Sequence, residues 1–359
     1  MPAYKDDKTG RWYCKFNYKD YKDNIKQKKK SGFERKKDAE TWERDFLKAS
    51  QGQPTMLFSD FLEIYKKDNY PQLRLRTQQT KNERYKRVLP TFGNMPLDSI
   101  SPLDVRKWQN SMISEGLSSK YIGSIQNEFS TVLNHAVKFY GLKENPIHKV
   151  GKVKVPNEMP IPMRFWTLEE FKEVYQYIDD IKAKTAINLL YWTGIRKGEL
   201  LALRWSCIDF DNKTLMIESS LQRIKGKDII TPTKTYETRV LTLADTTINI
   251  LRDYKNMVYK PKDTDLVFNW EKRFIENGIK LGVDKANDEN KTKKIARIHV
   301  HGLRHSHASY LINHGVNIVL ISKRLGHKNT SITLDTYSRF YPLADDRMVE
   351  MMNKDSLEN

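Results

Sequence analysis

The chain has 359 residues, of which 38% are hydrophobic, so it is long enough to bury more than one core and we expect two or three domains. Its 63 Lys and Arg outnumber its 45 Asp and Glu, and the resulting charge of +18 is typical of proteins that bind a polyanion, most often nucleic acid. No apolar run approaches the ~20 residues of a membrane-spanning helix and no signal-peptide pattern is present, so we expect a cytoplasmic protein without a membrane partner.

The two cysteines, Cys14 and Cys207, lie far apart in sequence. They therefore provide neither a disulfide framework nor a cysteine-based zinc site, and both are interpreted as small apolar residues.

Residues 1–52 predict a small sheet with one helix. Trp12, Cys14 and Phe16 alternate with polar neighbours as in a half-buried strand, a second strand is expected over 24–31, and residues 34–50 have an apolar helical face. Between Lys22 and Lys37 the segment has eight basic and two acidic residues, which predicts a basic platform that binds DNA or, alternatively, a solvated charged face. The candidate DNA-binding side chains here are Lys22, Lys26, Lys28, Lys29 and Lys30.

Residues 53–146 predict a compact all-helical domain of four helices. Phe58, Phe61 and Tyr65 recur at helical spacing, and a second helix through Tyr85 is expected to stop near Pro90. A third helix has a start signal at 101–104, with serine at the N-cap, proline next and aspartate three residues on, and a fourth runs from 118 to 141.

Residues 147–165 predict an extended linker. Together with Asn145 and Pro146 they form a proline-rich stretch without a periodic apolar face. Lys149, Lys152 and Lys154 in this stretch are candidates for contact with a phosphate backbone.

Residues 166–345 contain four motifs that point to chemistry, after a helix start signal at Thr167 and Glu170. In "YWTGIRKGELLALRW", Gly194 ends a helix, and Arg196 and Glu199 are three residues apart, close enough to interact. In "IITPTKTYETRVLTL", two strands are predicted with Lys234 at the tip of a tight connection. Considered alone, Arg196 in the first motif could be an ordinary surface arginine, and Lys234 in the second could be a solvated lysine without a function.

The third motif, "HVHGLRHSHASYLINHG", is rich in histidine. Six of the eight histidines fall between residues 299 and 327, and His301 and Arg304 are one helical step apart, so both can point into one cleft. Metal binding is the rival interpretation, yet the motif has no carboxylate and its spacing matches neither a zinc-hydrolase helix nor a zinc finger.

The fourth motif, "LGHKNTSITLDTYSRF", has His327 ten residues before Tyr337. The chain has 18 tyrosines, and most tyrosines only pack and donate one hydrogen bond, so a packing role is the alternative to a nucleophilic one.

Taken together and in this order, the motifs "TGIRKGELLALRW", Lys234 on a strand connection, "HGLRHSHAS", "LGH" and "TLDTYSR" resemble those of the tyrosine recombinases, or phage integrase family. The resemblance is good over residues 167–341 and looser over the four helices, which are similar to the family's core-binding domain. The N-terminal unit looks like the arm-binding domain of integrases from temperate phages and conjugative transposons, a three-stranded sheet packed on a helix.

The resemblance implies a fold class and a domain order. We expect a multidomain α+β chain with an arm-type DNA-binding domain at 1–52, an all-α core-binding domain at 53–146 and a linker at 147–165. A mixed, mainly helical catalytic domain with a small antiparallel sheet is expected at 166–345, and a C-terminal tail at 346–359.

The resemblance also implies roles for the motif residues in DNA cleavage and rejoining through a 3′-phosphotyrosine. Tyr337 would be the nucleophile, Arg196 and Arg304 would hold the nonbridging phosphate oxygens, and Lys234 would protonate the leaving 5′-oxygen. His301 would accept and donate a proton near the nucleophile, His327 would donate a hydrogen bond to the phosphate, and Glu199 would brace the site. Because positive side chains stabilise the transition state, no cofactor or metal ion is expected.

The implied partners are double-stranded DNA at core and arm attachment sites and three further copies of the chain in a cyclic tetramer. An excisionase and a DNA-bending protein are candidate accessory partners. Met348, Val349, Met351 and Met352 could dock the tail on a neighbour, although a frayed terminus fits the composition equally well. Whether Tyr337 attacks within its own subunit or a neighbour's stays open.

Rival functions are a type IB topoisomerase, a Xer-like resolvase and a DNA-binding regulator on an inactive recombinase scaffold, with a metallohydrolase built on the histidines as a further alternative. The additional N-terminal domain favours an integrase, and the filled catalytic positions favour an active enzyme.

Overall fold

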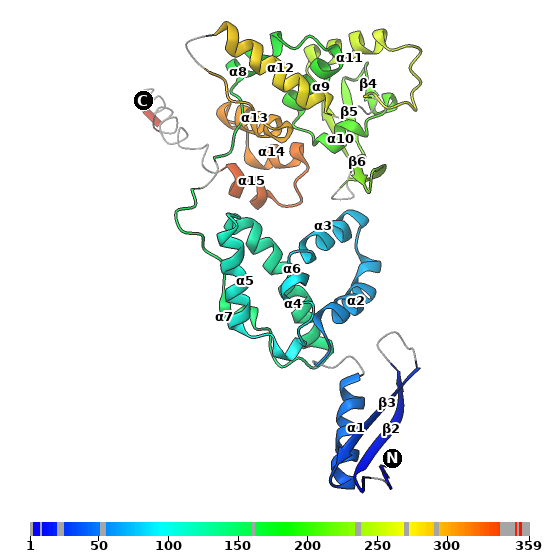
Figure 1. Cartoon of the computed structure of the whole chain (residues 1–359). Coiled ribbons are helices and arrows are strands. Elements are labelled where there is room, and N and C mark those ends of the chain that lie inside the picture. The colour runs from blue at the N-terminus through cyan, green and yellow to red at the C-terminus, as the bar shows by residue number, and fades with distance from the viewer. Residues whose placement is uncertain are drawn as a thin grey trace. The chain divides into compact units, whose positions relative to one another are not determined.

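The computed structural model describes residues 3–7, 9–19, 25–50, 55–159, 162–233, 238–268, 273–290 and 294–337, together with 349 and 352–353; the side chains of 19, 26, 45 and 47–50 are not described. The chain divides into two compact units, Met1–Pro160 and Ile161–Asn359 (Figure 1). None of the described helices is long and apolar enough to cross a membrane.

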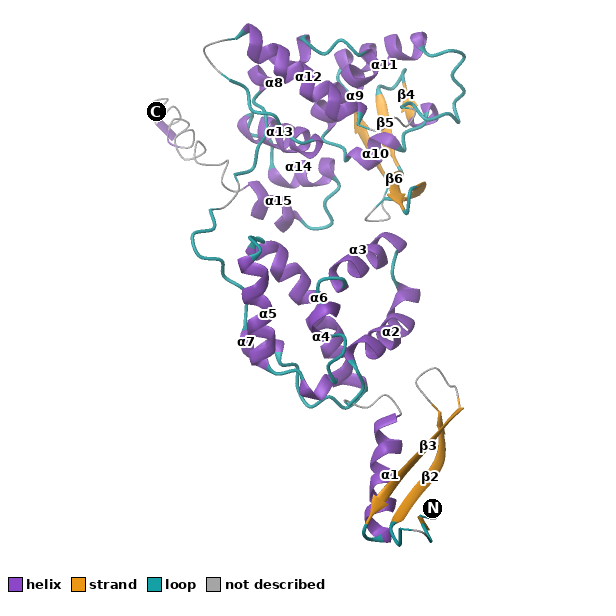
Figure 2. Cartoon of the chain, viewed as in Figure 1, coloured by secondary structure: helices purple, strands orange, loops and turns teal. Residues whose placement is uncertain are grey.

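The N-terminal residues form a three-stranded antiparallel sheet and a helix, as the resemblance implied (Figure 2). The strands are β1 (Tyr4–Lys5), β2 (Trp12–Lys19) and β3 (Ile25–Phe33), in that order in the sheet, and the helix is α1 (Lys36–Ser50). The predicted alternation in β2 is confirmed, because Cys14 and Phe16 are buried and the Phe16 ring meets the Phe46 ring of α1 edge-on at 5.5 Å.

The lysines of β3 do not form one basic platform. Lys28 is paired with Phe16 and its ammonium lies 5.7 Å from the Phe46 ring, on the side of the sheet that faces α1. Lys29 is paired with Lys15 and lies 4.5 Å from the Tyr13 ring, on the opposite side. The period of two along a strand sends neighbouring side chains to opposite faces, so a run of consecutive lysines is divided between them. Lys22 and the side chain of Lys26 lie outside the described part.

The all-helical domain begins after the arm unit. Its elements are α2 (Phe58–Asn69), a 3₁₀ turn at Tyr70–Gln72, α3 (Leu75–Tyr85), α4 (Leu89–Phe92), a 3₁₀ turn at Leu97–Ser99, α5 (Pro102–Ser114), α6 (Ser119–Phe139) and α7 (Ile147–Val150). Phe129 of α6 occupies the centre of the core, with the rings of Phe58, Phe92 and Trp108 at centroid distances of 5.0, 4.7 and 5.8 Å.

Two local predictions in this domain have different outcomes. The start of α5 is confirmed, because Ser101 and Asp104 form a reciprocal capping box. The predicted end of the second helix is wrong, because α3 stops at Tyr85 and Pro90 lies in the first turn of α4. The backbone N–H groups in the first turn of a helix have no partner within the helix, so proline, which has no N–H, is tolerated there. A proline can therefore mark the start of a helix as readily as the end of one.

The first part of the expected linker packs on the helical domain. Ile147, Val150 and Val153 are buried in its core, and Arg106 donates a hydrogen bond to the Val150 carbonyl at 2.7 Å. These three apolar residues recur at every third position, so the prediction that this stretch lacks a periodic apolar face is wrong for its first part. Lys152 and Lys154 are exposed, and Lys149 pairs with Glu144 at 2.5 Å.

The second unit is mainly helical with two small sheets. Its helices are α8 (Leu168–Gln176), α9 (Ile181–Thr193), α10 (Lys197–Leu201), α11 (Asp245–Met257), α12 (Phe274–Glu289), α13 (Val300–Asn313), α14 (Ile318–Leu325) and α15 (Thr330–Tyr337), with a 3₁₀ turn at Trp205–Cys207. Helix α9 is buried on nearly all sides and contacts α11, α12 and α13, so it is the central support of the domain (Figures 1 and 2). The predicted capping box of Thr167 and Glu170 is confirmed at α8.

The strands are β4 (Ile208–Asp209), β5 (Thr214–Ile217), β6 (Ser219–Ile224), β7 (Lys227–Pro232) and β8 (Arg239–Thr242). The strands predicted on each side of Lys234 are present, but they do not pair with each other: β7 pairs with β6, and β8 pairs with β5. The hairpin prediction is therefore wrong, because strands that are neighbours in sequence need not be partners in a sheet. Lys234 itself lies outside the described residues, as do Met348 and Met351.

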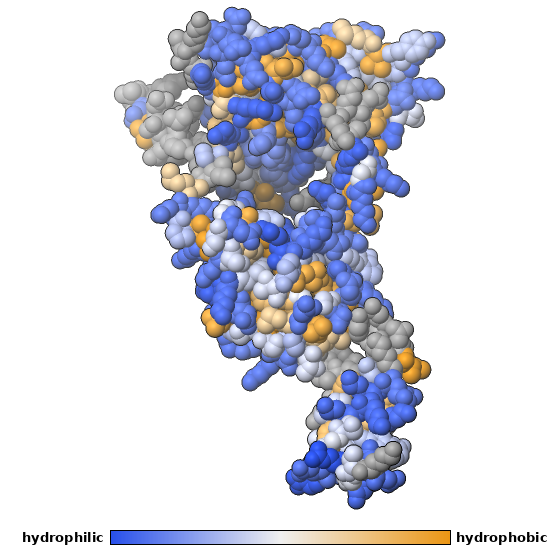
Figure 3. Space-filling model, viewed as in Figure 1, coloured by the Kyte–Doolittle hydropathy of each residue, from blue (hydrophilic) through white to orange (hydrophobic). Residues whose placement is uncertain are grey.

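The face drawn in Figure 3 is mostly hydrophilic, with hydrophobic residues in small scattered groups. Such a surface is usual for a folded domain, in which isolated hydrophobic residues remain exposed.

Gly194 ends α9 in the left-handed conformation, with φ of 67°. A Cβ atom at this position would lie 2.6 Å from the His307 ring and 2.8 Å from Leu325, so both the backbone and the packing require glycine.

We expect Gly194→Ala to lower the free energy of unfolding by about 3 kcal/mol, since it combines left-handed strain with a clash in the interior. Gly315→Ala is the matched control, because Gly315 has φ of 73° but no atom within 4 Å of its Cβ position, and we expect it to cost only about 1 kcal/mol. Urea denaturation measures the free energy of unfolding of the two variants. Equal decreases in the two would contradict a packing role for Gly194.

Candidate active site

Five of the six residues expected to act in catalysis line one cleft of about 490 Å³ in the second unit. Arg196 comes from the start of α10, His301 and Arg304 from α13, His327 from the turn after α14, and Tyr337 from the end of α15. Residues more than 130 positions apart in sequence therefore meet at one place. The sixth, Lys234, lies outside the described part.

Arg304 is buried and held by two helix ends. Its two terminal nitrogens donate to the carbonyl of Gly194, after α9, at 2.8 Å and to that of Leu325, in the last turn of α14, at 2.7 Å. Carbonyls at a helix C-terminus carry partial negative charge, which suits a cation. Burial, and then the charge of Arg196, lowers the pKa of Arg304 to about 9, so the group stays positive at neutral pH.

Arg196 is held in the same manner. One terminal nitrogen donates to the Gly326 carbonyl at 3.1 Å, the other to Glu199 at 2.8 Å, and the Arg196 backbone N–H donates to the second Glu199 oxygen at 2.9 Å. A guanidinium has five N–H donors, and described residues accept two from each of these arginines, so both keep donors for a ligand in the cleft.

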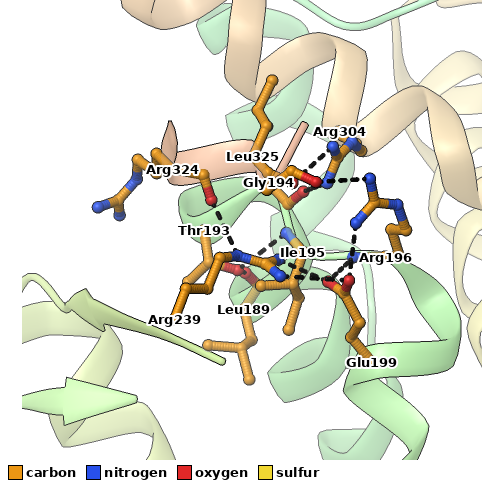
Figure 4. Close-up of polar contacts among 11 residues, drawn as sticks. Leu189, Thr193, Gly194, Ile195, Arg196, Glu199, Arg239, Arg304, Arg324 and Leu325 are labelled. Atoms are coloured by element: carbon orange, nitrogen blue, oxygen red, sulfur yellow. Dashed lines mark hydrogen bonds and ion pairs between the residues drawn. The ribbon is translucent and has the colours of Figure 1, made fainter. Parts of the chain in front are cut away.

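Glu199 is buried beneath this pair and forms ion pairs with two guanidiniums, those of Arg196 and Arg239. Arg239 of β8 donates to both of its oxygens, at 2.6 and 3.3 Å, and also donates to the Arg324 carbonyl at 3.2 Å. Figure 4 shows Arg239 and Arg196 approaching the carboxylate from different sides. Although burial acts in the opposite direction, the hydrogen bonds and charges of Arg239 and Arg196 hold the pKa of Glu199 below its usual range.

Arg239 was missed by the sequence analysis. It lies 40 residues from Glu199 on a strand, and no local pattern distinguishes it from other exposed basic residues. Its position also explains Gly326, where a Cβ atom would lie 2.8 Å from the Arg239 guanidinium.

The cleft histidines are neutral at pH 7 in the free protein. His327 shares a hydrogen bond of 2.7 Å between its Nδ1 and the buried Thr333 hydroxyl, and burial, followed by the charges of Arg304 and Arg196, lowers its pKa to about 4. His301 lies at the rim with part of its ring exposed, and partial loss of solvent together with the same two arginines lowers its pKa.

Tyr337 is 1% exposed, and its hydroxyl lies 2.8 Å from the Nδ1 of His305. Burial raises the pKa of Tyr337 to about 12, although the charge of Arg304 acts to lower it. The phenol is therefore protonated at neutral pH. His305 was also missed, although residues 301, 304 and 305 share one helical face and the spacing could have indicated it.

His307 and Arg324 fix α14 to the rest of the domain. Arg324 donates to the His307 Nε2 at 3.1 Å and to the Trp192 carbonyl, at the end of α9, at 3.2 Å. This contact joins the two helix ends whose carbonyls hold Arg304.

Among the described residues, no group of three or more His, Cys, Asp or Glu side chains is arranged to hold a metal ion. Three histidines of this region are instead hydrogen-bonded to single side chains: His305 to Tyr337, His307 to Arg324 and His327 to Thr333. Both cysteines are buried and free.

Two guanidiniums with spare donors, neutral imidazoles and a buried phenol, which are the kinds of group that phosphoryl transfer to a tyrosine requires, thus line one cleft. Residues 164–342 match the Phage integrase family, residues 57–113 match its N-terminal SAM-like domain, and residues 2–50 match an arm DNA-binding domain. The chain belongs to the phage integrase family and is a tyrosine site-specific recombinase.

Relatives support this assignment. The chain is 26% identical to the ICEBs1 integrase of Bacillus subtilis, covering 81% of this chain and 79% of the relative. It is 24% identical to the transposase from transposon Tn916 of Enterococcus faecalis, covering 82% and 77%.

Solved structures share the fold. The Tn1549 transposon integrase in complex with transposon right end DNA matches with a TM-score of 0.68 and 22% identity, over 83% of this chain and 99% of that one. A lambda integrase dimer bound to a core site matches with a TM-score of 0.59 and 16% identity, over 95% of each chain.

We expect Arg239→Ala to destabilise the protein by about 3 kcal/mol, because it leaves the buried Glu199 carboxylate without its bidentate partner. Lys285→Ala is the control, since its ion pair with Asp179 is exposed and should contribute less than about 1 kcal/mol. Urea denaturation compares the two variants, and an equal loss would show that Arg239 is no more than a surface charge.

The free energy of unfolding should depend on pH through the buried imidazole of His307. Burial, and then the charge of Arg324, lowers its pKa from 6.5 to about 3, so between these values the unfolded chain binds a proton that the folded chain does not. This contribution is fully present above pH 6.5 and is lost as the pH falls, by at most about 1.4 kcal/mol per unit. We expect His307→Asn to flatten the slope of unfolding free energy between pH 6 and 4.5, whereas His314→Asn, at an exposed residue, should not. If the unfolding free energy of wild type and of His307→Asn changed equally with pH, the assignment of this pH dependence to His307 would be refuted.

Proposed function

We propose that this chain is the integrase of a mobile genetic element, which cleaves and rejoins double-stranded DNA through a 3′-phosphotyrosine at Tyr337. The observation that carries the proposal is that Tyr337 lines the same cleft as Arg196 and Arg304 of its own chain. This supports attack within the same subunit. One relative is named an integrase and another is named the transposase of a transposon, and these names support the mobile-element assignment.

The two arginines would bind the scissile phosphate. Each keeps N–H donors after its contacts to carbonyls and Glu199, and the helix ends fix both guanidiniums before DNA arrives. Negative charge that develops on the nonbridging oxygens during attack would strengthen these hydrogen bonds, which lowers the barrier. His327, with its Nδ1 engaged by Thr333, would present its other ring nitrogen to the phosphate.

Proton transfer completes the reaction. Lys234, from the connection between β7 and β8, would protonate the leaving 5′-oxygen, and His301 at the rim would exchange a proton near the nucleophile. The phosphotyrosine keeps the energy of the broken phosphodiester, so a 5′-hydroxyl from a second duplex can reverse the step without ATP.

The partners would be core sites bound by the helical and catalytic domains and arm sites bound by the N-terminal unit. Residues 2–50 match an arm DNA-binding domain, which favours an integrase over a Xer-like resolvase. Lys29 with Lys15 and Lys28 with Lys30 offer basic side chains on the two faces of the sheet, and Lys152 and Lys154 are exposed. A lambda integrase tetramer bound to a Holliday junction has a similar fold, which supports assembly of four copies. The C-terminal tail would be a docking segment, and an excisionase and a DNA-bending protein would be accessory partners.

Purified protein incubated with a nicked attachment-site duplex should form a covalent protein–DNA adduct in EDTA, and Tyr337→Phe should abolish it because the attacking oxygen is removed. Denaturing electrophoresis measures the adduct. Tyr310→Phe, on the neighbouring helix α13 but outside the cleft, is the control and should react normally. Complete absence of an adduct with wild-type protein would favour a DNA-binding regulator.

A crossover assay with two sites separates an integrase from a topoisomerase. Recombinant products are expected here, whereas relaxation of supercoils without exchange would favour the topoisomerase.

A further inference from the structure

The hydrogen-bond partner of the Tyr337 hydroxyl is His305. The Oη of Tyr337 and the Nδ1 of His305 are 2.8 Å apart, within the range for proton transfer between a phenol and an imidazole. His301, which the family resemblance indicated as the proton acceptor, lies one helical turn before His305, with the two rings perpendicular and their centroids 4.8 Å apart. His305 follows Arg304 directly in α13, so the helix that holds a phosphate-binding group also holds this imidazole.

The protonation states give the hydrogen bond its direction. Burial, followed by the neighbouring His301 and Arg304, lowers the pKa of His305 to about 4, so the ring is neutral at pH 7. The phenol is protonated, because its own pKa is raised to about 12. Tyr337 therefore donates the hydrogen bond, and the Nδ1 of His305 accepts it with a free lone pair.

Two other kinds of described side chain that line the cleft are less suited to accept this proton. Arginine side chains have no acceptor, and His327 has its Nδ1 engaged by Thr333 and its other ring nitrogen assigned above to the phosphate. His305 meets the geometric requirement for a general base in the site as it stands.

We propose that His305 is a catalytic residue of strand cleavage, which takes the phenol proton from Tyr337 as the nucleophile attacks. The inference rests on the proposed function. As the bond from Tyr337 Oη to phosphorus forms and the bond from phosphorus to O5′ breaks, the proton moves from Oη to His305 Nδ1. O5′ receives a different proton from Lys234. During rejoining both protons return, and His305 acts as the acid for the departing phenol.

Bound DNA makes this transfer more favourable than it is in the empty cleft. The phosphodiester would carry a negative charge beside Arg304, which opposes the positive charge that disfavours an imidazolium at His305. In the absence of DNA, burial keeps the phenol protonated, and burial together with the neighbouring His301 and Arg304 keeps His305 neutral. The phenol would thus become reactive only once a scissile phosphate is in place.

The test uses single-turnover cleavage of a nicked attachment-site duplex by the full chain. His305→Asn keeps a polar group close to the position of Nδ1 but cannot carry the proton, and we expect it to form the adduct about 100-fold more slowly than wild type. His314→Asn, at an exposed histidine on the same helix, should react at the wild-type rate. A wild-type rate for His305→Asn would overturn the proposal, because it would show that His305 only positions the tyrosine.

A second substrate separates activation of the nucleophile from protonation of the leaving group. With sulfur in place of the bridging 5′-oxygen, the leaving group departs as a thiolate and needs no proton. We expect this substrate to rescue Lys234→Ala but not His305→Asn, since attack still requires loss of the phenol proton. Rescue of His305→Asn would overturn the assignment.

Two controls keep the results interpretable. A mobility-shift assay should give equal DNA binding for wild type and His305→Asn, which shows that the variant is folded. Wild-type protein that forms no adduct would contradict the proposed function itself, whereas a normal wild-type adduct with an equally fast His305→Asn contradicts only this inference.

Discussion

The active site depends on holding three guanidiniums close together around a single carboxylate. Arg196, Arg239 and Arg304 would repel one another in an apolar interior, and Glu199 neutralises only one of their charges. The carbonyls of Gly194, Leu325 and Gly326, at the C-terminal ends of α9 and α14, supply the rest of the compensation. A net positive charge is left, and a phosphodiester is the group that balances it.

Much of this arrangement was predictable because its parts are local. Arg196 caps α10 and Glu199 is the third residue of that helix, whereas His301 and Arg304 are one helical turn apart, so local spacing alone brought each pair together. The left-handed glycine after α9 and the capping boxes of α5 and α8 were predictable for the same reason, since each is determined by a few consecutive residues. The order of the motifs then indicated the family.

Other features depend on contacts between distant segments and were not predictable. Arg239 reaches Glu199 across 40 residues, and its strand pairs with β5 rather than with the strand that precedes it in sequence. Pro90 fits either end of a helix, and only packing around Phe92 makes it a start. Ile147, Val150 and Val153 do recur at every third position, but three residues are too short a pattern to identify the surface of α5 and α6 on which they are buried.

Helix α15 has only eight residues, yet it carries two parts of the site. Thr333 holds the His327 ring, and Tyr337 lies one helical turn further on the same face. The support of the His327 ring and the Tyr337 hydroxyl thus depend on the same short helix, and a displacement of α15 would affect both together. The guanidiniums of Arg196 and Arg304 would keep their positions, because their partners lie outside this helix.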